Sequence, residues 1–148
     1  MNISKAMKKL KKLKNRSSAI SGKILKHNRS LESNTQIYDV RDLLCEYREI
    51  VEEIVSIKCA IMKANVESGN YDKILRIGEL KGLKAVLSNV DTSSGIDEDS
   101  FPYRTEGKSP VFNAQLGEKD IDYMTSTIDD EIEVYLEDLD GFNATTTI

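Results

Sequence analysis

Two long stretches of the chain repeat their apolar residues at alternating spacings of three and four. This spacing keeps the apolar side chains on one narrow side of an α-helix, and over several turns it is typical of helices that pack along their length. The stretches cover residues 3–27 and 39–65. We therefore expect a long antiparallel helical hairpin. Its main apolar positions are Ile3, Ala6, Leu10, Leu13, Ile20 and Ile24 in the first helix, and Val40, Leu43, Tyr47, Ile50, Ile54, Ile57, Ile61 and Ala64 in the second.

The second helix has a broader apolar surface than the first. Leu44, Val51, Val55 and Met62 widen its stripe on both flanks. A helix with so wide an apolar surface is expected to pack against more than one neighbour. Asp39 is suited to cap its beginning, and residues 68–70 (Ser-Gly-Asn) are suited to end it.

Two further helices follow, which makes the predicted fold all-α. Residues 71–90 are predicted to form a third, shorter helix. It contains Gly78 and Gly82 one turn apart, which either permit close helix packing or are tolerated at the surface. Glu118 and Asp120 favour a helix start through the macrodipole, and Gly141 stands where a C-terminal cap would fall. The helices are predicted at about 3–28, 39–66, 71–90 and 118–142, within one domain of residues 1–148.

Residues 91–117 break the helical pattern. The segment DTSSGIDEDS has the composition of a loop, and residues 101–104 and 111–114 flank the sequence TEGKSP. Both proline residues of the chain lie here, as expected outside helices. We expect a short extended or β-ribbon excursion near residues 100–115.

Charge is distributed unevenly, although the whole chain has a net charge of only -4. Residues 1–29 hold ten basic and no acidic side chains, whereas residues 117–141 hold ten acidic side chains and one lysine. The favoured interpretation is that these two segments neutralise each other, within one chain or between chains. The alternative is a nucleic-acid-associated protein in which basic side chains bind phosphates; these are Lys8, Lys9, Lys11, Lys12, Lys14 and Arg16. Binding of the first helix to a membrane surface is disfavoured, because its apolar side lacks Trp and Phe.

The residues of an ordinary catalytic or metal centre are missing from the sequence. His27 is the one histidine, and it follows a basic helix at a position typical of a polar residue near a helix end. Cys45 and Cys59 are fourteen residues apart on one predicted helix, about 21 Å at 1.5 Å per residue, which is too far for a disulfide between them. The acidic runs 97–99 and 129–131 lack the spacing of a calcium loop. We predict no enzymatic activity, cofactor, metal site or membrane span, and a reducing cytoplasmic location.

Several strings in order resemble the septicolysin-like family of small helical proteins of bacteria and bacteriophages. They are ISKAMKKLKKLKNR, YDVRDLLCEYREIVEEIVSIKCAIMKAN, IGELKGL and IDDEIEVYLEDLDGFNATTTI. The resemblance implies a mostly helical fold with a long hairpin, a small β-excursion and self-association. It implies no established activity and transfers no catalytic residue.

The predicted function is a non-enzymatic, self-associating structural or interaction protein, forming a homo-oligomer or a larger assembly. If encoded by a bacteriophage, it would be a virion or accessory component. The expected protein interface consists of Leu10, Leu13, Ile20, Ile24, Tyr47, Ile50, Ile54, Ile57, Ile61, Ile128, Ile132 and Tyr135.

Overall fold

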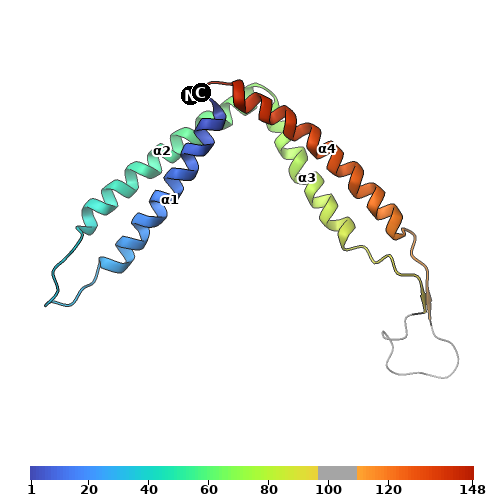
Figure 1. Cartoon of the computed structure of the whole chain (residues 1–148), viewed down its shortest axis with the longest axis horizontal. Helices are drawn as coiled ribbons and strands as arrows, with labels where there is room; N and C mark the ends of the chain where they lie inside the picture. Colours follow the sequence, from blue (N-terminus) through green and yellow to red (C-terminus); the bar gives the residue numbers. More distant parts are fainter. Residues whose placement is uncertain (97–109) are drawn as a thin grey trace. The chain divides into compact units, whose positions relative to one another are not determined.

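The computed structural model describes residues 1–96 and 110–148. In this part of the chain the order is α1 (Ile3–His27), α2 (Val40–Glu67), α3 (Asn70–Ser88), β1 (Gly95–Ile96), β2 (Val111–Phe112) and α4 (Glu118–Thr145) (Figure 1). The predicted fold class, all-α with a short β-excursion, is confirmed. The chain divides into two compact units: the first is Met1–Asp72 with Asp138–Ile148, and the second is Lys73–Glu137.

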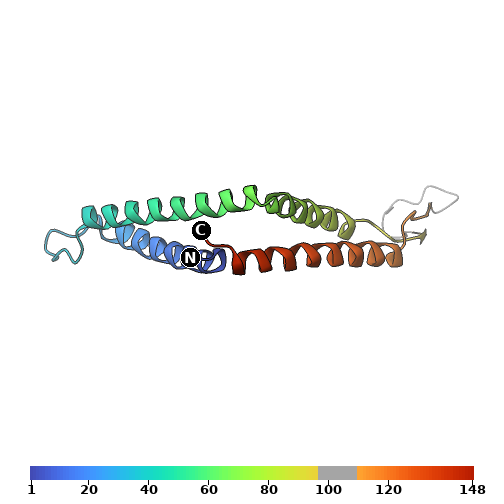
Figure 2. The same ribbon diagram turned by 90° about the horizontal axis from the view of Figure 1, so that it is seen from above.

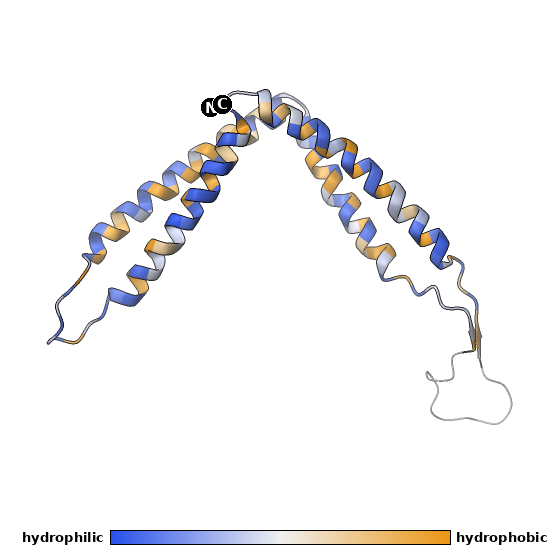
Figure 3. Cartoon of the chain, in the orientation of Figure 1, coloured by the Kyte–Doolittle hydropathy of each residue, from blue (hydrophilic) through white to orange (hydrophobic). Residues whose placement is uncertain are grey.

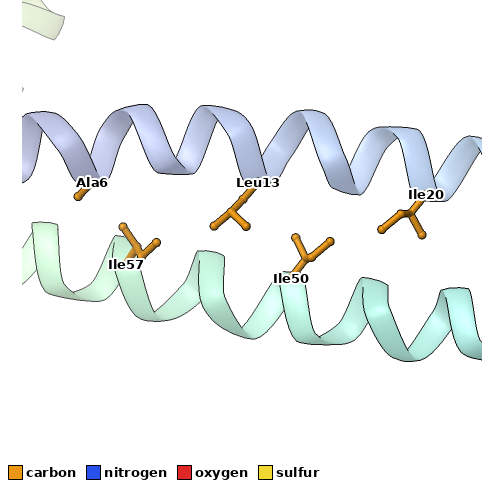
Figure 4. Close-up of a cluster of buried hydrophobic side chains, with 5 residues drawn as sticks. All are labelled: Ala6, Leu13, Ile20, Ile50 and Ile57. Atoms are coloured by element: carbon orange, nitrogen blue, oxygen red, sulfur yellow. The ribbon is translucent and has the colours of Figure 1, made fainter.

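The first unit is built on the antiparallel α1–α2 hairpin, in which the two helices lie side by side (Figures 1 and 2). Its buried centre consists of Ala6, Leu13 and Ile20 from α1 facing Ile50 and Ile57 from α2 (Figure 4). The predicted hairpin and its apolar positions are therefore confirmed. Further side chains of both predicted stripes pack against this centre: Leu10, Ile24, Leu43, Tyr47, Ile54 and Ile61.

Local sequence signals set both ends of α2. The Asp39 side chain accepts a hydrogen bond from the backbone N–H of Arg41 at 2.8 Å, so the predicted N-cap is confirmed. At the other end, Ser68 donates its backbone N–H to the carbonyl oxygen of Ala64 at 3.1 Å. Gly69 then has a φ of +76°, a left-handed conformation that favours glycine, and α3 begins at the next residue.

The C-terminal segment returns to the first unit, an association that the sequence does not predict. Asn2 and Thr147 form an antiparallel bridge. The N–H of Ile3 donates to the carbonyl oxygen of Thr146 at 3.1 Å, and that of Ile148 to the carbonyl oxygen of Met1 at 2.9 Å. We call this pairing of residues 1–3 with residues 146–148 the terminal clasp. Ile3, whose backbone takes part in this pairing, is fully buried.

In the second unit, α3 and residues 118–137 of α4 run antiparallel and are joined through the ribbon (Figure 1). Ile77, Leu87, Ile128 and Ile132 are buried there. Lys84 of α3 forms an ion pair with Asp129 of α4, with 2.6 Å between Nζ and Oδ2.

The strands β1 and β2 pair antiparallel, with Gly95 opposite Phe112 and Ile96 opposite Val111. Val111 and Phe112 lie in a segment predicted to be extended. Gly95 and Ile96 lie in the acidic segment predicted to be a loop, and that interpretation was wrong for these two residues. Their pairing with Val111 and Phe112 makes them a short strand, although the neighbouring residues have the composition of a loop. The other expected arm, residues 101–104, lies outside the described residues.

Two further details differ from the sequence prediction. Gly141 lies within α4 and does not cap it, because the helix continues to Thr145 and ends where Thr146 enters the terminal clasp. Gly78 and Gly82 are exposed, and a Cβ atom built on either would meet no other atom within 4 Å. Of the two interpretations of these glycines, the structure favours tolerance at the surface.

Candidate interaction surfaces

Most residues predicted to form a protein interface lie in the core of the α1–α2 hairpin. Leu13, Ile20, Ile50 and Ile57 are buried there. Leu10, Ile24, Tyr47, Ile54 and Ile61 pack around them. Their contacts in the structure are therefore made within one chain, and a role between chains stays a prediction.

The remaining predicted interface residues lie in α4. Ile128 and Ile132 are buried in the second unit. Tyr135 is half-buried, and its hydroxyl donates to Glu131 Oε1 at 3.2 Å, one turn earlier on the same helix. These residues also serve the fold of the chain itself.

A second apolar stripe on α2 remains exposed. Leu44, Val51, Val55, Met62 and Val66 retain between 37% and 56% of their accessible surface. Their spacings of seven and four residues place them in one row along the helix, beside the stripe that faces α1. The alternation of apolar and polar residues along the helices is visible in Figure 3. We call this row the α2 stripe. Four of its members were predicted to widen the apolar stripe on both flanks, but their spacing places them on one flank, and Val66 was missed.

The basic residues of α1 divide into two groups. Lys9 forms an ion pair with Glu53, and Arg16 forms one with Glu46, whose Oε1 also accepts a hydrogen bond from Arg16 Nε at 3.0 Å. These two side chains therefore help to fix the hairpin. Of the six residues in the nucleic-acid hypothesis, the other four are exposed and form no ion pair with any described residue: Lys8, Lys11, Lys12 and Lys14.

A row of lysines lies on one side of α1, outside the stripe of buried residues that packs on α2. Positions 5, 8, 12, 15, 19, 23 and 26 follow each other at spacings of three or four, so they share one side of the helix. Five of them are exposed lysines, namely Lys5, Lys8, Lys12, Lys23 and Lys26. We call this set the lysine face. Lys5, Lys23 and Lys26 were missed from the sequence, although the helical spacing that groups them was visible.

The acidic side chains of α4 are also largely exposed. Asp122, Asp130, Glu133 and Glu137 lie on one side of the helix by their spacing, and we call them the acidic face. The ion pair of Asp129 runs to Lys84 of α3. Among the described residues, the ion pairs found for α1 thus run to α2. The expected neutralisation between α1 and α4 stays a prediction.

The groups that could support catalysis or metal binding are isolated. His27 contacts Tyr38 edge-on, with 4.9 Å between ring centroids. Cys45 and Cys59 are free and exposed. In residues 1–96 and 110–148, no group of three or more His, Cys, Asp or Glu side chains could hold a metal ion. The acidic run 97–99 lies outside these ranges.

The turn between α2 and α3 contains the buried polar side chains of Asn65 and Asn70. Asn65 Oδ1 has no hydrogen-bond partner among the residues that the structure describes. Leaving a buried acceptor unpaired costs about 1–3 kcal/mol. A single amide oxygen offers neither a nucleophile nor a base, so this feature does not indicate a reaction centre.

Within the described part of the chain, the carboxyl group of Asp91 has a lowered pKa. The hydroxyl and the backbone N–H of Ser93 both donate to Asp91 Oδ1, at 2.5 and 2.9 Å. These hydrogen bonds, the hydroxyl first, lower the pKa of Asp91 below its ordinary value. The arrangement orders the chain after α3, before the ribbon begins.

Among the helices that the structure describes, none combines the length and the apolar character needed to span a membrane. Comparison of the chain with known protein families, with curated proteins and with solved structures found no match.

Proposed function

We propose that this chain is a non-enzymatic helical protein that associates with further copies of itself through the α2 stripe. The proposal is supported most directly by the exposure of Leu44, Val51, Val55, Met62 and Val66 in a row along α2. Contiguous apolar surface of this kind marks interaction sites, whereas isolated exposed apolar residues need no explanation.

The architecture of the hairpin explains why this stripe is left over. Two helices can cover one side of each other, and the stripe that contains Ile50 and Ile57 already faces α1. The α2 stripe lies outside that contact, and Val55 at its middle is 48% exposed. Covering it removes apolar surface from water at about 25 cal/mol per Å², which favours association.

The spacing of the stripe suits a second copy of the same helix. Leu44 and Val66 lie equally far from Val55 along the sequence, as do Val51 and Cys59. An antiparallel copy, related by a two-fold axis near Val55, would therefore place Leu44 opposite Val66, Val51 opposite Cys59 and Met62 opposite Arg48. Two-fold interfaces require such self-complementarity.

The test is the mass of the full chain in solution, measured by gel filtration with light scattering from low to high micromolar concentration. We expect a dimer or larger species for the native chain. In buffer with about 500 mM NaCl, which screens contacts between exposed charges, Val55→Glu should yield a monomer with unchanged helicity. The matched control is Ser56→Glu, an exposed neighbour outside the stripe, which should associate like the native chain. A native chain that is monomeric throughout this range contradicts the proposal.

The septicolysin-like resemblance agrees with this proposal, since self-association is what that family implies. In a bacteriophage, the same association would suit a virion or accessory structural component. Purified particles provide the test, because mass spectrometry would detect the chain in them at a stoichiometric level.

Nucleic-acid binding is the second candidate, and the lysine face is the observation that favours it. Lys8 and Lys12 are the members of this face that the sequence hypothesis named. Binding would release counterions, so affinity for a short DNA duplex must fall steeply as salt rises. Filter binding across salt measures this, and binding that is absent at low salt or independent of salt excludes the candidate.

A further inference from the structure

The lysine face of α1 lacks acidic partners in the described chain. The ion pairs of this helix join Lys9 to Glu53 and Arg16 to Glu46, on the side toward α2. The five lysines of the outer face form no ion pair with any residue that the structure describes. Lys23 has one neighbour of another kind, because its Nζ lies 4.9 Å from the ring centroid of Tyr38.

The acidic face of α4 is in the complementary situation. Asp122, Asp130, Glu133 and Glu137 are exposed, and within residues 1–96 and 110–148 no ion pair is formed by any of them. At 1.5 Å per residue the acidic face extends over about 22 Å and the lysine face over about 31 Å. The two rows thus have opposite charge, similar length and the same helical geometry.

We propose that the lysine face of one copy binds the acidic face of α4 on a second copy. This inference rests on the proposed self-association and adds a second, electrostatic contact to it. Exposed ion pairs contribute only about 0–1 kcal/mol each, so the contact depends on the whole row. Its main effects are the choice of partner and the orientation of the copies.

A second copy is favoured over nucleic acid by the charge of the whole molecule. The chain has a net charge of -4, which opposes approach to a polyanion. No aromatic residue alternates with the lysines along α1, and the ring of Tyr38 at one end of the face already contacts Lys23 and His27. Every copy, in contrast, carries an acidic face at the same concentration as its lysine face.

The proposed contact joins two different surfaces, so it differs in symmetry from the α2 stripe. An interface between unlike surfaces leaves one free lysine face and one free acidic face on each pair of copies. Further copies can then add until a ring closes or a filament grows. The structure thus assigns two contacts with different salt sensitivity, an apolar one on α2 and an ionic one between α1 and α4.

The experiment uses two charge-reversed forms of the full chain. The first is Lys8→Glu with Lys12→Glu, and the second is Asp130→Lys with Glu137→Lys. All four positions are exposed, and circular dichroism verifies the fold. Each reversed form alone places like charges opposite one another at the substituted positions, whereas an equimolar mixture restores opposite charges there between unlike forms. The control carries Arg29→Glu and Lys81→Glu, which lie outside both faces and change the net charge by -4, as the first form does; the second form changes it by +4.

Sedimentation velocity follows the size of the species at about 50 mM and about 500 mM NaCl, because salt at the higher concentration screens exposed charges within a few ångströms. We expect the native chain and the control to form species at about 50 mM NaCl that are larger than those at about 500 mM NaCl. For each reversed form alone, the dissociation constant of the ionic contact should rise by about tenfold or more. In the mixture, the larger species should form again. Recovery in the mixture requires contact between chains.

Several outcomes overturn the inference, and they differ from failure of the proposed function. A mixture that does not recover, or reversed forms that grow like the native chain, removes the ionic contact while the apolar association stands. A native chain that is monomeric at both salt concentrations removes the proposed function itself. A lysine face that binds a fluorescent DNA duplex at low salt, without any growth of the protein alone, assigns the face to nucleic acid instead.

Discussion

The side-chain amide of Asn2 donates a hydrogen bond to the carbonyl oxygen of Ala144 at 2.8 Å. The same side chain accepts one from the backbone N–H of Lys5 at 2.9 Å, through Oδ1. One residue therefore satisfies an unpaired N–H in the first turn of α1 and an unpaired carbonyl in the last turn of α4. Such groups at helix ends have no partner within their own helix.

Replacing Asn2 should destabilise the chain through both ends of this contact. We expect Asn2→Ala to lower the free energy of unfolding by about 1–2 kcal/mol, measured by urea denaturation and circular dichroism. Asn2→Asp keeps the acceptor for Lys5 and loses the donor to Ala144, so its effect should be smaller. Asn15→Ala, an exposed position within α1, is the control. Equal stability of Asn2→Ala and the native chain would contradict the role given to this side chain.

Adjacent residues of α2 should respond differently to truncation. Ile50 is 3% exposed within the hairpin, whereas Val51 is 37% exposed on the α2 stripe. We expect Ile50→Ala to cost about 2–4 kcal/mol, because it removes contacts and leaves a cavity. Val51→Ala should cost less than about 1 kcal/mol when unfolding is measured at dilution, with its larger effect on association. If both variants lost a similar free energy of unfolding, the α2 stripe and the stripe that faces α1 would not be distinct surfaces.

Two glycines, one at the α2–α3 junction and one within α3, should give effects of opposite sign. Gly82 lies in a helix with open space around its missing Cβ, so Gly82→Ala should raise the free energy of unfolding by about 0.5–1 kcal/mol. Gly69 has a φ of +76°, so Gly69→Ala should lower it by about 1–2 kcal/mol. Thermal denaturation distinguishes the signs. A destabilising Gly82→Ala would instead indicate that a neighbour packs against that side of α3.

Acid should weaken the turn that follows α3. The pKa of Asp91 is lowered by hydrogen bonds from Ser93, so its carboxylate form is the one stabilised in the folded chain. That stabilisation is present above the unfolded pKa of about 3.9 and is lost as the pH falls through the lower folded value. NMR titration of the Asp91 carboxyl measures this directly. Ser93→Ala should raise the pKa toward its ordinary value, and Ser126→Ala, a distant exposed site, should leave it unchanged; an unchanged pKa in Ser93→Ala would contradict the assignment.

The helices were predictable because their signals are local and repeated. The three-four alternation is sufficient to mark the residues of the hairpin core, from Ala6 to Ile57. Asp39 and the sequence Ser68-Gly69-Asn70 marked the ends of α2, because caps depend on residues within a few positions. The predicted limits therefore lie within a few residues of those observed.

The contacts between distant segments were not predictable in the same way. Met1 and Ile148 are 147 positions apart, and no local pattern indicates that their backbones pair. The strand Gly95–Ile96 has two residues, which is too short to show a period of two. Lys9 forms an ion pair with Glu53 of α2, whereas its neighbour Lys8 is exposed and forms none with a described residue. This difference depends on which side of α1 faces α2. The sequence alone did not identify α2 as the helix that supplies the carboxylates.

The discontinuous make-up of the first unit has a consequence for biosynthesis. Residues 138–148 complete the unit that begins at Met1, so the terminal clasp can close only after residues 73–137 have left the ribosome. At translation rates of about 5–20 residues per second, those 65 residues take roughly 3–13 s. During that interval, residues 1–3 lack the backbone hydrogen-bond partners that residues 146–148 supply in the complete unit.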